Sequence, residues 1–407
     1  MNMSGFSIFG SASWPVRRGN PFNSNVSPVK ATGRGEPLWS VALPERGANG
    51  IAVAEDGTCF VNLDNHFVAV TPREGIRWTT QANYALSTPI VLADGRLIVY
   101  ENHTLAIREQ ATGKPLSTLP SYYATMPAIT PQGHLVYSGR ENADKASQFQ
   151  MMTLAGQRIW TLPVGFSQLR APLVLNDLII TTDKSYMRAF NLEGELQWIA
   201  DQEGFILANP DTCVQLTTKD NPIKSGLDDR VVSPIIGLGD GQVLAGLEWY
   251  SGAGYYLFDI HNHSVRPLGK HLLLKKPLAV PLLPERGPCL VTKGPSVKDK
   301  LGMRRSSVVM VDMNGQTVWE HQLPIPPSAI IADASGNIFI ISSPSFDRWD
   351  KYRVWYKLEE ECFVRGLSPE GKELFTWYAP GPISPSMAIG KNGELYVVAE
   401  GKLWAVG

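Results

Sequence analysis

The stretch YMRAFNLEGELQW, at residues 186–198, combines an alternating apolar strand, a turn that ends in glycine, and a second strand whose tryptophan lies four positions after that glycine. The phrase recurs as GEPLW, GQRIW and GQTVW, which start at Gly35, Gly156 and Gly315, and in the close variants GIRW, GKPLS and GKELF, which start at Gly75, Gly113 and Gly371. From Gly35 to Gly194 the successive steps are 40, 38, 43 and 38 residues. Steps of this length are typical of four-stranded propeller blades.

A second pattern fills the space between these phrases, namely an apolar strand, a turn that ends in glycine and another apolar strand. Examples are TPIVLADGRLIVY at 88–100, MPAITPQGHLVYS at 126–138 and SAIIADASGNIFII at 328–341. Glycine supplies the positive φ of a hairpin turn, and Val, Ile, Leu and Tyr favour strands. We therefore expect an all-β chain, in which only the segment around 347–361 has a pattern compatible with a helix.

The repeats predict an eight-bladed β-propeller whose blades of four antiparallel strands, A to D in chain order, start near 50, 87, 126, 171, 232, 276, 328 and 384. The eighth repeat reaches Gly407 after three strands, whereas PLWSVAL at 37–43 is a D strand without a blade. We predict that this N-terminal strand completes blade 8 and closes the ring, which removes free sheet edges. Residues 35–407 would then form one domain, after an N-terminal extension at 1–34 that is either poorly ordered or packed on the propeller.

The phrase YMRAFNLEG followed by ELQW resembles the pyrroloquinoline-quinone-like repeat of quinoprotein dehydrogenases and of the outer-membrane assembly lipoprotein B, over about residues 35–407. Dehydrogenases of that family hold their quinone above adjacent disulfide-linked cysteines beside a calcium ion. The four cysteines of this chain are far apart, so we expect no cofactor and no quinone-dependent activity. Burial of a large aromatic side chain stabilises an interface, and we expect the repeated tryptophans to wedge between blades, namely Trp39, Trp78, Trp160, Trp198 and Trp319.

The amino-acid composition disfavours some classes of binding partner. The formal net charge is −1, from 37 Lys and Arg against 38 Asp and Glu, which disfavours nucleic acid or an anionic membrane as a partner. No apolar run approaches the ~18 residues of a membrane-spanning helix. Arg17 and Arg18 follow the first apolar residues instead of preceding them, which argues against a signal peptide. The sequence predicts a soluble, cytoplasmic monomer.

Four long insertions share one face of the predicted propeller. The A–B and C–D turns lie on one face and are short, whereas the insertions are B–C or D–A connections, at 139–148, 201–231, 294–305 and 343–360. Long loops on a rigid scaffold commonly carry function. This face is therefore the predicted location of a binding site.

Two of these insertions have a distinctive composition. The insertion at 343–360 carries aromatic and basic side chains that would stack on a planar ligand or a protein partner, or else pack on their own blade, including Trp349, Tyr352, Arg353 and Trp355. The insertion at 294–305 is basic, with Lys298, Lys300, Arg304 and Arg305, and is either an anion site or a solvated loop.

The D–A connections bring further side chains to the mouth of the central channel. The candidates for ligand or partner binding are Tyr122, Tyr123, Gln168, Arg170, Lys275, Lys276, Asp229 and Arg230. A confined arginine such as Arg170 either engages a ligand or forms a structural ion pair. His261 and His263 in DIHNH have the alternate spacing of metal ligands, but they align with C–D turns and lack a third ligand nearby, so we expect no metal site.

The sequence is compatible with two functions of different class. The first is a binding or scaffold protein that holds a small molecule or a protein at the long-loop face and central funnel. The second is a propeller enzyme, a lyase, cyclase or hydrolase, with its site at the channel mouth on the same face. The absence of a recognised catalytic motif favours the binding protein.

Overall fold

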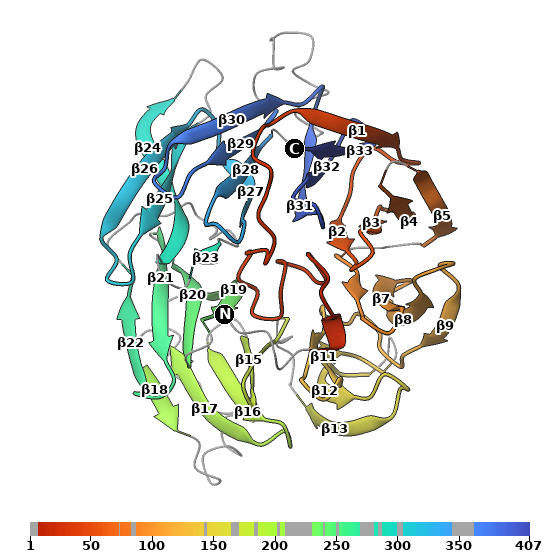
Figure 1. The fold of residues 1–407 in the computed structure, drawn as a ribbon. Coiled ribbons are helices and arrows are strands. Elements are labelled where there is room, and N and C mark those ends of the chain that lie inside the picture. Colours follow the sequence, from red (N-terminus) through yellow and green to blue (C-terminus); the bar gives the residue numbers. More distant parts are fainter. Residues whose placement is uncertain are drawn as a thin grey trace.

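The computed structural model describes residues 7–72, 74–82, 87–141, 145–163, 171–182, 186–201, 204–207, 230–238, 241–249, 252–268, 281–283, 287–298, 304–343 and 362–407. Within these ranges the chain forms eight antiparallel sheets around a ring, so the predicted eight-bladed β-propeller is confirmed (Figure 1). The one described helix is a short 3-10 turn, η1 (Ser7–Phe9). No described helix is long and apolar enough to cross a membrane.

Blades 1 to 3 have the four predicted strands, whereas blade 4 has a fifth. Blade 1 contains β2 (Gly50–Val53), β3 (Cys59–Asn62), β4 (His66–Thr71) and β5 (Gly75–Gln81). Blade 2 contains β6 (Ile90–Val91), β7 (Arg96–Glu101), β8 (Thr104–Glu109) and β9 (Pro115–Thr118). Blade 3 contains β10 (Ala128–Ile129), β11 (Leu135–Gly139), β12 (Gln148–Met152) and β13 (Arg158–Pro163). Blade 4 contains β14 (Leu173–Leu175), β15 (Leu178–Thr182), β16 (Met187–Asn191), β17 (Leu196–Asp201) and β18 (Gly204–Leu207).

Blades 5 to 8 complete the ring. Blade 5 contains β19 (Arg230–Gly237), β20 (Gln242–Trp249), β21 (Gly252–Asp259) and β22 (Ser264–Pro267). Blade 6 contains β23 (Leu282–Leu283), β24 (Gly287–Lys298), β25 (Arg304–Val311) and β26 (Thr317–Leu323). Blade 7 contains β27 (Pro327–Ala332), β28 (Ile338–Ser342), β29 (Phe363–Leu367) and β30 (Glu373–Tyr378). Blade 8 contains β31 (Ile383–Ile389), β32 (Leu395–Ala399), β33 (Lys402–Val406) and the N-terminal β1 (Pro37–Ala42).

The two ends of the chain close the ring as predicted. Strand β1 pairs antiparallel with β33, with Val41 opposite Leu403 (Figure 1). The pairing continues beyond both strands, because the backbone N–H groups of Glu36 and Gly407 each donate to the other residue's carbonyl at 2.9 Å. Blade 8 therefore has its fourth strand.

Two of the predicted insertions contain more regular structure than the sequence indicated. The insertion at 201–231 begins with β18, a fifth strand that pairs with β17. The basic segment at 294–305 is not a simple loop, because β24 extends to Lys298, which pairs with Arg304 at the start of β25. The register shifts between Lys293 and Lys298, so the pairing is interrupted before it resumes at Lys298 and Arg304.

The recurring Trp and Gly join neighbouring blades at three junctions. Trp78, Trp160 and Trp319 donate from Nε1 to carbonyls in the next blade, of Gln110, Leu192 and Pro369, at 2.9, 2.8 and 2.9 Å. A Cβ added to the next blade's glycine would approach the same indole ring, at 2.8 Å for Gly113, 2.9 Å for Gly194 and 2.6 Å for Gly371. The predicted wedging of tryptophans between blades is thus observed at these three junctions, which we call Trp–Gly clasps.

The clasp is absent at the junction of blades 8 and 1, where a Cβ added to Gly75 would meet no atom within 4 Å, and the junction of blades 4 and 5 also departs from the pattern. Trp198 is 3% exposed, and no described group accepts a hydrogen bond from its Nε1. The C–D turn of blade 5, DIHNHS, lacks the glycine of the phrase. Instead Phe205, on the additional strand β18, packs edge-on to Trp198 with the ring centroids 5.0 Å apart. The fifth strand therefore supplies the apolar partner at this junction.

Candidate functional site

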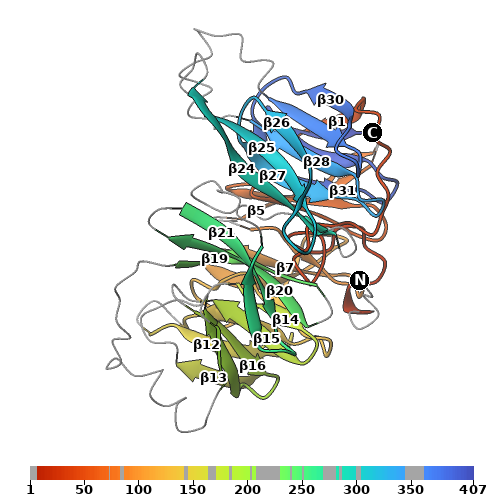
Figure 2. The same cartoon turned by 90° about the vertical axis from the view of Figure 1, so that its left-hand side faces the viewer.

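The N-terminal segment, residues 7–34, crosses the middle of the ring, on the face of the A–B and C–D turns (Figures 1 and 2). It exchanges backbone hydrogen bonds with the ends of A strands in four blades. These bonds run from Val53 N to Trp14 O at 2.8 Å, Val91 N to Pro15 O at 2.8 Å, Gly237 N to Phe22 O at 2.9 Å, and Ser27 N to Ala332 O at 2.9 Å. The blade 8 A–B turn adds a fifth contact, from Thr32 N to Gly393 O at 3.0 Å.

Side chains of the N-terminal segment are part of the hydrophobic core. Phe9, Trp14, Val16 and Phe22 are each at most 9% exposed. The carboxylate of Asp333, in the blade 7 A–B turn, is fully buried and accepts the Ala31 N–H at 2.9 Å. The segment therefore covers the turn-face end of the channel. We call the opposite side, where the B–C and D–A connections lie, the connection face.

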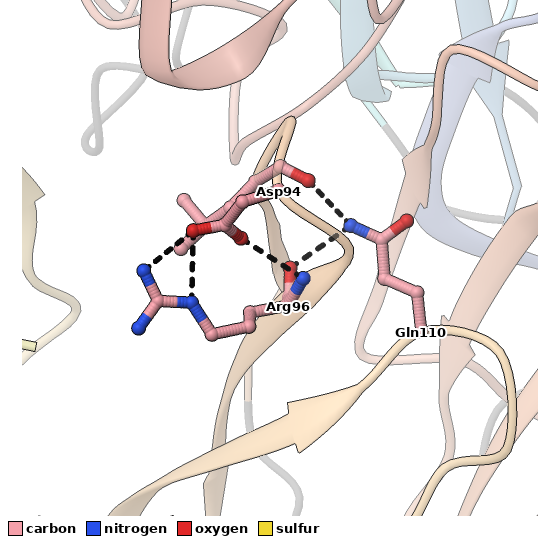
Figure 3. A network of polar contacts seen from close by, with 4 residues as sticks. Asp94, Arg96 and Gln110 are labelled. Atoms are coloured by element: carbon pink, nitrogen blue, oxygen red, sulfur yellow. Dashed lines mark hydrogen bonds and ion pairs between the residues drawn. The ribbon is translucent and has the colours of Figure 1, made fainter.

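A polar network rigidifies the A–B turn of blade 2 beneath this segment. Arg96 donates to the Asp94 carboxylate from its backbone N–H at 3.1 Å and from Nε at 2.9 Å (Figure 3). The hydrogen bond from the Arg96 guanidinium is the main cause that lowers the pKa of Asp94. Gln110 Nε2 donates to the Arg96 carbonyl at 2.9 Å, and Ala93 N donates to Ile8 O at 2.7 Å. This cluster positions the N-terminal segment, so its role is structural.

A cavity of about 50 Å³ lies between the N-terminal segment and blades 2, 3 and 4. The lining residues that belong to the blades lie at or just before the start of the A strands, and they include Ile90, Met126 and Ala171. Because the D–A connections lead into these starts, the cavity lies toward the connection face. A buried water needs roughly 10–15 Å³ measured in this way, so the space admits a few atoms of that size.

Arg17 and Arg18 present the positive charge of this cavity. Among its described lining residues they are the only charged ones. Arg17 is exposed to the channel and Arg18 is partly exposed, yet protein surrounds both. Loss of bulk water lowers the pKa of both guanidiniums, and repulsion from Arg17 lowers the pKa of Arg18 further, while Tyr255 acts in the opposite direction. Neither guanidinium forms an ion pair with a described carboxylate.

Tyr122 and Tyr123 lie on the connection face but do not line this cavity. Tyr122 forms a two-way backbone bridge with Arg140, at 2.6 and 2.7 Å, and thereby ties blade 2 to blade 3. Tyr123 is 45% exposed, and its ring lies 4.5 Å from that of Tyr122 and 4.8 Å from that of His103, measured between centroids. The two tyrosines belong to the D–A connection after blade 2, and they form an aromatic cluster with His103 of the B–C turn of that blade.

The structure places some of the other candidates on strands. Arg230 begins β19 opposite Glu248, whereas Arg304 and Arg305 begin β25. His261 and His263 lie in the C–D turn of blade 5, as the alignment of turns predicts. No described group of three His, Cys, Asp or Glu side chains is placed to hold a metal ion. The remaining candidates lie outside the described residues, namely Gln168, Arg170, Asp229, Lys275, Lys276, Trp349, Tyr352, Arg353 and Trp355.

Sequence reasoning missed Arg17 and Arg18 as site residues. They belong to no repeat, and their place after the first apolar residues indicated only the absence of a signal peptide. The available signal was the density of large aromatic residues around them, since Phe9, Trp14 and Phe22 in a short segment need a surface to pack on.

No protein-family model matches the chain, and no curated protein matches its sequence. Solved structures align with 91% of it. The computationally designed Ika8 protein has 13% identity and a TM-score of 0.56, with 99% of its chain covered. The WD40 β-propeller domain of Doa1 and a streptogramin B lyase each have 11% identity and 96% coverage, with TM-scores of 0.48 and 0.45. The likeness to the designed propeller shows the fold alone.

Proposed function

We propose that this chain is a non-catalytic binding protein that recognises its ligand or partner at the connection face, through the channel cavity and the long connections around it. The observation that carries the proposal is the N-terminal segment, which covers the channel at its turn-face end. A channel covered at one end is a concave pocket with rigid walls, the usual form of a ligand site. β-Propellers commonly serve as binding scaffolds.

The same proposal includes the finer properties that the sequence indicates. We propose that the repeats are of the pyrroloquinoline-quinone-like type, which the Gly and Trp phrase supports, with no bound quinone. We also propose a cytoplasmic, monomeric protein with no nucleic acid or membrane partner, which the near-neutral charge supports. The alternative, a lyase, cyclase or hydrolase, depends on residues such as Arg170 and Asp229, and no described contact favours it.

The first experiment is native mass spectrometry of the gently purified protein, compared with a variant that fills the cavity. Ala171 lines the cavity, so Ala171→Trp should displace a small molecule bound there. Ala111→Trp, at an exposed C–D turn on the opposite face, is the matched control and should keep it. A third variant with a shortened 343–360 connection tests whether a protein partner binds at that connection. A protein that co-purifies with the wild type and is lost only in this variant would bind there.

A bound molecule retained in all three variants would contradict this location. Turnover of the bound molecule by the purified wild-type protein would favour the enzyme instead. A wild-type protein that carries no ligand and no partner would also count against the proposal.

A further inference from the structure

The two arginines of the cavity come from a backbone turn that is held firmly in place. Arg18 has a φ of 65° and Gly19 one of 81°, so a residue with a Cβ occupies the left-handed region next to a glycine. A Cβ on Gly19 would lie 2.8 Å from the Trp14 ring, which shows how closely the buried indole packs against this turn. Left-handed conformations of non-glycine residues cost free energy and cluster at functional sites.

Hydrogen bonds from the following residues fix the same turn. Asn25 N donates to the Arg18 carbonyl at 2.9 Å. The buried Asn20 side chain accepts from Phe22 N at 3.1 Å and donates to Val26 O at 2.9 Å, and Asn23 Nδ2 reaches the Ile235 carbonyl of blade 5 at 3.3 Å. The arginine side chains therefore project from a fixed point on the channel wall, as a preorganised site requires.

The positive charges of this turn have no ion-pair partner among the described residues. Arg17 and Arg18 are adjacent, both line the cavity, and no described carboxylate pairs with either. Arg18 Nε is buried and makes no hydrogen bond to a described residue. Two like charges that are close together and partly removed from water raise the free energy of the unliganded protein. A bound anion would offset both costs.

The chemistry of the two side chains selects the kind of anion. Guanidinium groups bind planar or tetrahedral oxyanions through paired N–H donors. The remaining lining is mostly apolar, with Phe9, Val16, Ile90 and Met126 among its members, and the space of about 50 Å³ admits one compact group.

We propose that Arg17 and Arg18 bind the phosphate or carboxylate group of a small-molecule ligand inside the channel cavity. The proposal rests on the binding function proposed above and names the ligand class of that site. The charged group reaches the arginines beside the N-terminal segment, while the rest of a larger ligand extends toward the connection face. The lowered pKa of both guanidiniums agrees with their partial desolvation.

The test is calorimetric titration at low ionic strength with inorganic phosphate and, separately, acetate. We expect the wild-type protein to bind at least one of them, and the double variant Arg17→Gln/Arg18→Gln to lose about tenfold or more in affinity. Arg34→Gln removes an exposed arginine from the same N-terminal segment and should bind as the wild-type protein does. Phosphate binding without acetate binding assigns a phosphoryl ligand, and the reverse assigns a carboxylate.

The single variant Arg17→Gln protects the test against a folding defect, because Arg17 is exposed to the channel and makes no described hydrogen bond. Because it removes the repulsion of Arg18, it should melt at or above the wild-type temperature without ligand and still show weakened binding. Equal affinity in the wild-type and double variants, or no binding of either anion, would overturn the anion site. If Ala171→Trp displaces a co-purified ligand that the arginine variants retain, the channel function stands and the anion site alone is wrong.

Discussion

The indole Nε1 of Trp160, on the outer strand of blade 3, donates a hydrogen bond of 2.8 Å to the carbonyl of Leu192 in blade 4. Gly194, two residues beyond that carbonyl, packs against the same indole ring. The phrase that repeats along the sequence is therefore a contact between blades as well as a turn within one. At the three Trp–Gly clasps the glycine packs against the tryptophan of the preceding blade, so there the repeat stabilises the fold only together with its neighbour.

We predict that Trp160→Phe lowers the free energy of unfolding by about 1–3 kcal/mol, from the lost hydrogen bond and the smaller ring. Trp198→Phe is the matched control, because the Trp198 Nε1 has no described acceptor and its loss removes only packing. Urea unfolding of both variants measures the difference. If Trp198→Phe is as costly as Trp160→Phe, the hydrogen bond to Leu192 contributes nothing measurable.

The glycine of the same clasp gives a second prediction. Gly194→Ala would place a Cβ 2.9 Å from the Trp160 ring at a φ of 87°. Gly95→Ala is the control, since its φ of 86° is almost the same but no atom lies within 4 Å of the added Cβ. We expect Gly95→Ala to cost about 1 kcal/mol through the backbone alone, and Gly194→Ala to cost about 1–3 kcal/mol more. Equal melting temperatures for the two variants would show that the indole moves aside freely.

The clasps also explain which parts of the structure the sequence could predict. The eight blades, the closure of β1 on β33 and the inter-blade tryptophans all follow from a local pattern that repeats with a fixed step. Residues 7–34 have no repeat, and they are fixed by contacts with A strands far away in sequence, such as Trp14 with Val53 and Asn25 with Ala332. Pattern reasoning does not predict such pairings. The arginines of the cavity were missed for that reason, and Tyr122 and Tyr123, which were predicted at the channel mouth, are not among the described lining residues of the cavity.

The attachment of the N-terminal segment gives a third prediction. The buried Asp333 carboxylate accepts its own turn's N–H groups, from Ser335 and Asn337 at 2.9 Å, and also the Ala31 N–H of the segment at 2.9 Å. Asp333→Ala leaves that N–H without its acceptor. We expect a loss of about 2–4 kcal/mol in stability and faster tryptic cleavage at the exposed Lys30.

Asp312→Ala is the control for this loss. Asp312 accepts the equivalent hydrogen bonds of its own turn, from Asn314 N at 2.9 Å and Gln316 N at 2.8 Å, without a described contact to the N-terminal segment. It should cost about 1 kcal/mol and leave cleavage at Lys30 unchanged. Equal cleavage rates for both variants would mean that the Asp333 contact does not hold the segment on the channel.

The last prediction concerns acid stability at the junction of blades 6 and 7. His321 Nε2 lies 3.2 Å from Nη1 of Arg365, and because a guanidinium only donates, the imidazole accepts in its neutral form. Burial is the main cause that lowers the pKa of His321, the Arg365 charge adds to it, and Glu373 opposes it. The unfolded chain then takes up a proton near pH 6.5, where the native state does not.

Stability is therefore complete above about pH 6.5 and falls as the pH drops from there toward the lower native pKa. His321→Gln keeps an acceptor for Arg365 but cannot be protonated, so it should lose less stability than the wild-type protein between about pH 7.5 and about pH 5.5. Melting temperatures across this range measure the effect, and an NMR titration of the imidazole measures the pKa itself. Parallel losses in the two proteins, or a native pKa at or above 6.5, would show that His321 is not held neutral by its surroundings.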